Sequence, residues 1–135
     1  MNVPHEAHVA VVDGDRFLLL RNTGTNLEPK LELIAKPALE ATNFSAGVRD
    51  QDPASQRKGT NDLNELAHAA AAAEWLNRKV LDGKVQNLVV VADPKTLGEM
   101  RRHYHKELEA ALVGELAKAV TGAPLPQIEK IIADA

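Results

Sequence analysis

Residues 87–132, NLVVVADPKTLGEMRRHYHKELEAALVGELAKAVTGAPLPQIEKII, decide the fold of this chain. Residues 88–91 form a short apolar run that is typical of a strand covered on both faces. Asp93-Pro94 ends that strand, and we expect Asp93 to cap the following helix with Pro94 at its first position. Strand ends of this kind often hold the sites of α/β proteins, so Asp93 is a candidate functional residue.

The rest of this stretch predicts further elements. A helix from Pro94 would carry one apolar stripe formed by Leu97, Met100, Tyr104 and Leu108. Residues 112–120 fit either a continuation of that helix or a fifth strand, because Gly114 weakens the helical propensity. Residues 126–133 read as a short closing helix with Ile128, Ile131 and Ile132 inward.

Three strands are predicted before any helix. Residues 8–12 and 17–22 read as a hairpin joined by Asp13-Gly14, a preferred pair for tight turns. Residues 31–39 read as a third strand, which Pro37 would confine to an edge or end early. Residues 42–61 are polar and contain glycine, so they are expected to form a long loop.

An alanine-rich helix should follow that loop. Asp62 and Glu65 resemble a capping box, and the helix is expected to end near Gly83. Its apolar stripe comprises Leu66, Ala69, Ala73, Leu76 and Val80. The whole chain, residues 1–135, is therefore predicted to be one α/β domain with antiparallel strands first and helix-strand alternation later.

Composition narrows the classes of function. The 135 residues carry a formal charge of −3 and no cysteine, which argues against a global basic field and against cysteine-ligated metals. The first residues lack the pattern of an export signal, and no segment reaches the roughly 18 apolar residues of a membrane span. We therefore expect a cytoplasmic protein with no membrane association, no cofactor and no metal.

Two sequences together carry a family resemblance: HVAVVDGDRFLLLRNTG near the start and VADPKTLGEMRRHYHKELEAALVGELAKAVTG later. They resemble the host-attachment proteins, bacterial relatives of the middle domain of eukaryotic and archaeal peptide-release factors. This resemblance implies a mixed five-stranded sheet of the ribonuclease-H-like kind with helices on its faces, and it favours a strand at residues 112–120. It also implies a role in translation, near the ribosome, and a link to attachment to host cells.

In release factors the loop that matches residues 42–61 carries a Gly-Gly-Gln tripeptide, whose glutamine serves ester hydrolysis. This chain has no adjacent Gly-Gly-Gln there, so enzymatic activity is not carried over. The loop does hold polar and basic side chains that could contact ribosomal or transfer RNA. These candidate binding residues are Arg49, Gln51, Gln56, Arg57 and Lys58.

Asp13 and Asp93 support an alternative. If their strands lie side by side and parallel, the two carboxylates meet at one sheet end, as in metal-dependent nucleases of the ribonuclease-H-like kind. A third ligand would have to come from residues without a defining spacing: Asp15, Asp50, Asp52 or Glu99. Turn formation by Asp13 and helix capping by Asp93 explain both residues fully, and this is the preferred interpretation.

A basic cluster lies near residues 101–106, where Arg101, Arg102 and Lys106 could form an RNA-facing patch or complement the helix dipole. The histidines are expected at surface or cap positions and not as zinc ligands. The prediction is a non-enzymatic factor that binds the ribosome or structured RNA. The alternatives are a metal-dependent nuclease and a protein-binding module, and the sequence leaves the protein partner and the oligomeric state open.

Overall fold

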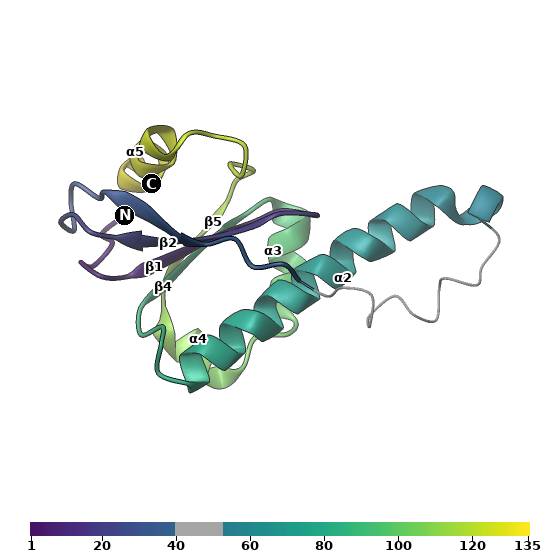
Figure 1. The fold of residues 1–135 in the computed structure, drawn as a ribbon, viewed down its shortest axis with the longest axis horizontal. Helices are drawn as coiled ribbons and strands as arrows, with labels where there is room; N and C mark the ends of the chain where they lie inside the picture. The colour runs from purple at the N-terminus through teal and green to yellow at the C-terminus, as the bar shows by residue number, and fades with distance from the viewer. Residues whose placement is uncertain (40–52) are drawn as a thin grey trace.

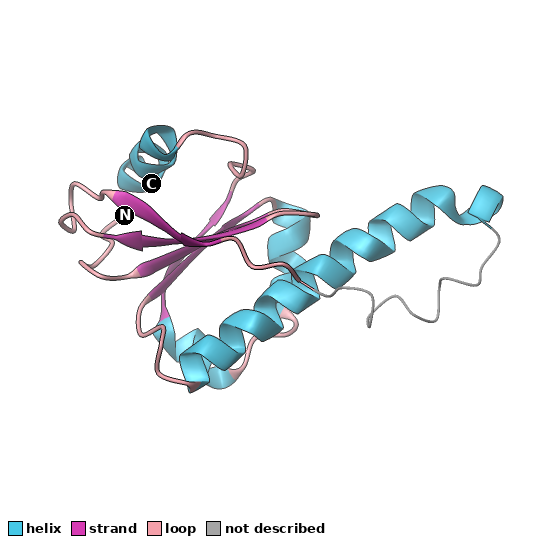
Figure 2. Cartoon of the chain, viewed as in Figure 1, coloured by secondary structure: helices cyan, strands magenta, loops and turns pink. Residues whose placement is uncertain are grey.

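The computed structural model describes residues 1–39 and 53–135, with the side chains of residues 53–61 left aside. Five strands form one sheet in the order β3-β2-β1-β4-β5. Figure 2 shows the strands of this sheet in magenta. Their bounds are β1 His8–Val12, β2 Phe17–Asn22, β3 Leu31–Ala35, β4 Leu88–Ala92 and β5 Leu112–Ala117. The first three strands pair antiparallel, whereas β4 is parallel to β1 and β5 is parallel to β4. The predicted mixed five-stranded α/β fold is confirmed, and residues 112–120 contain the fifth strand.

Helices cover both faces of this sheet (Figure 1). One face packs against α2 (Pro53–Leu81), α3 (Pro94–Arg101) and α4 (Lys106–Ala111), and the other packs against α5 (Leu125–Asp134). All five residues of β4 are buried because strands flank it on both sides and helices on both faces. None of the helices in the described part of the chain has the length and apolarity needed to cross a bilayer.

The alanine-rich stretch of α2 lies directly on the sheet. Ala69, Ala72 and Ala73 are fully buried, and their small side chains let the helix backbone approach the strands closely. Trp75 adds an aromatic contact, an edge-to-face pair with Phe17 at 5.2 Å between ring centroids. Gly83, with φ of 75°, ends the helix region in the left-handed conformation that glycine adopts without strain.

The predicted start of α2 at Asp62 is wrong, because the helix begins at Pro53 and takes in residues that the sequence assigned to a loop. Figure 1 shows why apolar periodicity failed there: this first part of α2 extends beyond the sheet, so no sheet face requires apolar side chains. The sequence did carry a signal, since Asp52-Pro53 repeats the Asp93-Pro94 pattern.

The predicted single helix from Pro94 is also wrong, because the chain breaks between α3 and α4. Asn77 of α2 stabilises the break: its side chain donates to the His103 carbonyl (2.8 Å) and accepts from the His105 backbone N–H (2.9 Å). His105 then caps α4 by accepting from the Glu107 N–H. The predicted apolar stripe holds across the break, with Leu97, Met100 and Leu108 buried and Tyr104 packed against the same core.

The hairpin connection differs from the predicted two-residue turn. Val12 pairs with Phe17, so residues 13–16 form a four-residue loop, and Gly14 does not take the positive φ that a tight two-residue turn would need. The third strand is an edge strand as predicted, and it ends at Ala35, before Pro37. The closing helix is confirmed, with Ile128 and Ile132 buried.

Candidate functional site

The strand ends that carry Asp13 and Asp93 lie next to each other. The parallel register of β1 and β4 pairs Val12 with Ala92, and the two aspartates are the residues that follow this pair. The sequence predicts this placement on the condition that the two strands are parallel neighbours, and β1 and β4 meet that condition. What the two carboxylates can do there depends on the contacts that each one makes.

Asp13 is held by a dense set of donors. Its Oδ1 accepts from the backbone N–H groups of Asp15 (2.9 Å) and Arg16 (2.6 Å), and its Oδ2 accepts from Arg16 Nε (2.9 Å) and from the Thr121 hydroxyl. Burial, the largest single effect, would raise the pKa of Asp13, but these hydrogen bonds together outweigh it and lower the pKa to about 2. Asp13 therefore closes the loop and ties it to the segment after β5.

Asp93 acts as the predicted N-cap of α3. Its Oδ2 accepts from the Thr96 N–H at 3.1 Å, and Pro94 occupies the first turn. Of the suggested third ligands, Glu99 contacts Arg102 and His103 just after its own helix, and Asp15 is largely exposed. Asp50 and Asp52 lie outside the described residues. No group of three metal-ligating side chains occurs within residues 1–39 and 62–135. In this part of the chain, the geometry favours loop closure and capping for the two aspartates.

The helix α2 is held at the same end of the sheet, beside the ends of β1 and β4. Asp62 accepts from Lys95 Nζ at 2.9 Å, His68 Nδ1 lies 2.9 Å from the Asp13 carbonyl oxygen, and the Glu65 side chain lies so close over Gly14 that a Cβ there would meet it at 2.7 Å. Asp62 therefore serves as a helix-to-helix contact and not as the predicted cap. These contacts fix the point from which the first turns of α2 extend.

The predicted basic cluster is partly neutralised. Arg101 donates to Glu115 through Nη2 (3.0 Å) and Nε (3.2 Å), and the Tyr104 hydroxyl donates to the same carboxylate. Arg102 pairs with Glu99 at 3.3 Å but leaves most of its side chain exposed. Lys106 has no carboxylate within 4 Å among the described side chains. Arg101 is thus a structural cation, whereas Arg102 and Lys106 remain available to a partner.

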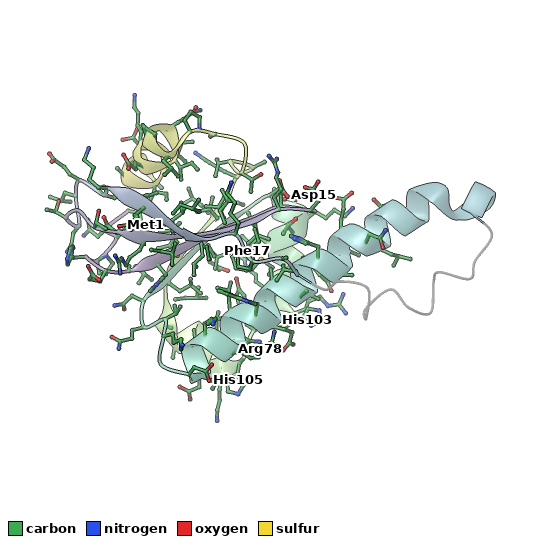
Figure 3. The ribbon with its side chains drawn as sticks, in the orientation of Figure 1. Met1, Asp15, Phe17, Arg78, His103 and His105 are labelled. Atoms are coloured by element: carbon green, nitrogen blue, oxygen red, sulfur yellow. The ribbon has the colours of Figure 1, made fainter. Side chains whose placement is uncertain are left out.

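Asn77 and Arg78 were missed by the sequence reasoning. Since Asn77 bonds the α3–α4 turn, it places Arg78 at the same end of the molecule as that turn, and Figure 3 shows Arg78, His103 and His105 around the C-terminal part of α2. No described carboxylate lies within 4 Å of the Arg78 guanidinium. An asparagine beside Leu76, in a helix whose neighbours are buried alanines, was the available signal. We call Arg78, Arg102, His105 and Lys106 the α2–α4 basic surface.

The remaining predicted residues fall into two groups. Arg49 and Gln51 lie outside the described residues. Gln56, Arg57 and Lys58 belong to the first turns of α2 and not to a loop, which corrects the predicted element for these three. A helix rises about 1.5 Å per residue, so the backbone of residues 57 and 58 lies about 30 Å along α2 from Arg78.

Comparison with known proteins identifies the family. No curated protein matches the chain. The family model described as bacterial archaeo-eukaryotic release factor family 12 matches residues 6–132, which takes in every strand of the sheet. That description agrees with the resemblance to release-factor middle domains and makes no mention of attachment to host cells. The chain is a member of bacterial archaeo-eukaryotic release factor family 12.

Proposed function

We propose that this protein is a small, non-enzymatic, cytoplasmic factor that binds the ribosome or structured RNA. Family membership supports a role connected with translation. The observation that carries the proposal is the pair of hydrogen bonds from the Asn77 side chain to the α3–α4 turn. These bonds bring Arg78 of α2 and Lys106 of α4 to one end of the molecule. Cations without an acidic partner are the groups that contact RNA phosphates most readily.

The long helix α2 supports the same proposal. Its sequence places Arg57 and Lys58 near one end and Arg78 near the other, about 30 Å apart along the helix axis. A helix whose sequence carries cations near both ends is suited to contacting phosphates of two RNA segments. Contacts to Asp13, Gly14 and Lys95 join residues 62–68 of α2 to the rest of the domain.

The absence of Gly-Gly-Gln from the sequence supports binding without ester hydrolysis. The release-factor tripeptide needs glycines beside the glutamine for backbone freedom, and neither Asp50-Gln51 nor Ser55-Gln56 supplies them. Under this proposal the chain keeps the release-factor domain as a ribosome-directed binding module. The link to host attachment rests on the resemblance alone and would be an indirect outcome of such binding.

Co-sedimentation of the purified protein with ribosomes at low and high salt tests this function. We expect binding at low salt that weakens as salt rises, because phosphate contacts release counterions. The net charge of −3 and the few unpaired cations predict a shallow salt dependence, with each phosphate contact contributing a slope of about 1 in the logarithmic plot. Failure to bind at low salt would reject the proposal.

A further inference from the structure

The α5 face of the sheet is only partly covered. α5 has 10 residues and packs over Leu20, Leu31 and Leu116, but it stops short of the strand ends near the β1–β2 loop. Leu33, whose register partner is Leu20, therefore lies on the same face and is still 41% exposed. Leu33 therefore offers an apolar contact on the part of this face that α5 leaves open.

A groove of about 620 Å³ occupies this uncovered part. Its apolar lining comes from Leu18 and Leu33 of the sheet and from Pro124 and Leu125 at the start of α5. Binding pockets usually measure a few hundred to about 1,000 Å³ and combine an apolar lining with a few polar groups, and this groove fits that pattern. It lies away from the α2–α4 basic surface, so a ligand in the groove would bind independently of RNA.

The groove borders the open edge of β3. The Thr23 N–H donates to the Lys30 carbonyl, so the backbone groups of Lys30 point toward β2. Because this direction alternates along an antiparallel strand, the backbone groups of Leu31 and Leu33 point away from β2, toward the open edge of the sheet. The outward N–H of Leu31 is already taken by Glu129 Oε2 at 2.8 Å. Among the described strands, β3 pairs only with β2. Leu33 is therefore the position where an extended chain could add backbone hydrogen bonds.

The charges at the rim favour an acidic partner. Lys36 is exposed and has no carboxylate within 4 Å in the described part of the chain, so it is the available cation of this rim. Arg16 pairs with both Asp13 and Asp15, although about half of its side chain is exposed. The N-terminus of α5 opens at Leu125 with no side-chain cap and no acidic residue in its first turn. Asp15 is the one acidic residue of the lining, and it belongs to the β1–β2 loop.

We propose that this groove binds an extended peptide segment of another protein that carries an apolar side chain followed, two residues later, by a carboxylate. In an extended chain these two side chains lie on the same side, about 7 Å apart. The apolar side chain fills the space between Leu33 and Leu125, and the carboxylate lies toward Lys36. The peptide backbone pairs with the outward groups of Leu33, which adds a short strand to the sheet.

The probe is the synthetic peptide acetyl-Thr-Leu-Thr-Glu-Thr-amide, titrated into the isotope-labelled full chain while backbone amide resonances are recorded. We expect saturable shifts at Leu33, Ile34, Lys36 and Leu125, with a Kd of about 1 mM, as suits five residues with one anchor. Lys36→Glu should weaken binding at least fivefold. The matched control Lys30→Glu, at the other end of β3, should leave the affinity unchanged.

Two altered peptides test the contributions of the apolar side chain and of the carboxylate separately. Replacing the peptide leucine by serine should abolish the shifts, and replacing its glutamate by lysine should weaken them at least fivefold. Equal binding of the lysine peptide, or no shifts at peptide concentrations well above the expected Kd, would overturn the proposal. It would also be overturned if the free protein dimerised through β3, seen as concentration-dependent sedimentation that Leu33→Glu removes, because the occupant would then be a second copy.

Discussion

The carboxylates at the ends of β1 and β4 and the cations around the α3–α4 turn differ in what the fold leaves available. Asp13 is saturated by loop amides, Arg16 and Thr121, whereas Arg78 and Lys106 have no acidic partner within 4 Å among the described residues. Both regions contain the residue types of functional sites. The difference shows that hydrogen-bonded carboxylates stabilise the fold at one end of the molecule. At the other end, cations that lack an acidic partner among the described residues are available to a binding partner.

The largest effect is expected from Asp13→Ala. This change removes the acceptor for two loop amides, Arg16 and Thr121, so the free energy of unfolding should fall by about 2–3 kcal/mol. Urea denaturation followed by circular dichroism measures it. The neighbouring Asp15→Ala, whose side chain is 86% exposed, should change stability by less than about 0.5 kcal/mol. A small effect at Asp13 would mean that its carboxylate is held for chemistry and not for structure.

Asn77→Ala should come next, with a loss of about 2 kcal/mol. It leaves the His103 carbonyl and the His105 N–H without their buried partner, and an unsatisfied buried polar group costs about 1–3 kcal/mol. Hydrogen exchange should show the α3–α4 turn opening first. If the turn kept its protection in this variant, Asn77 would not be the residue that holds the α3–α4 turn to α2.

A smaller loss, about 1 kcal/mol, is expected from Asp93→Ala, because an N-cap contributes this much to helix stability. Asp93→Asn should restore most of it, since asparagine caps nearly as well. Thermal unfolding of both variants measures the difference. A divalent-metal titration of the wild type in a calorimeter adds an independent check, because stoichiometric uptake lost in the Asp13→Asn and Asp93→Asn double variant would revive the nuclease alternative.

The pH dependence of stability tests the same carboxylate in a second, independent way. The folded pKa of Asp13 is about 2, below the ordinary value of 3.8, so its contribution is fully present above that ordinary value. It is lost as the pH falls through the window from 3.8 to about 2. Asp13→Ala should therefore have a shallower decline of unfolding free energy in that acid window than the wild type. Parallel declines would show that Asp13 does not carry this charge-dependent stabilisation.

The sequence predicted those elements whose signals are local. The buried run of β4, the Asp93-Pro94 cap and the inward isoleucines of α5 all depend on residues within a few positions of one another. The family resemblance, and not apolar periodicity, favoured the strand that the structure shows as β5. The break between α3 and α4 was not predicted because no glycine or proline marks it. The group that stabilises the break, the Asn77 side chain, belongs to a helix that is distant in sequence.

The candidate site was predictable to a lesser degree. The pairing of β1 with β4 brought Asp13 beside Asp93 as expected, but only the three-dimensional contacts show that Arg16 and Thr121 occupy the Asp13 carboxylate. In the same way, a run of basic letters at residues 101–106 does not reveal that Glu115 neutralises Arg101. Ion pairs between residues far apart in sequence decide which charges a partner can reach.

Ribosome binding by two charge-matched double variants tests the central claim most directly. Arg78→Glu with Lys106→Glu and the control Lys118→Glu with Lys130→Glu change the net charge equally, and the four side chains form no ion pair with any described carboxylate. Co-sedimentation at low salt should show at least a tenfold loss of affinity for the first variant and wild-type affinity for the control, with both folded by circular dichroism. Equal binding by the two variants, or a loss confined to the control, would contradict the account.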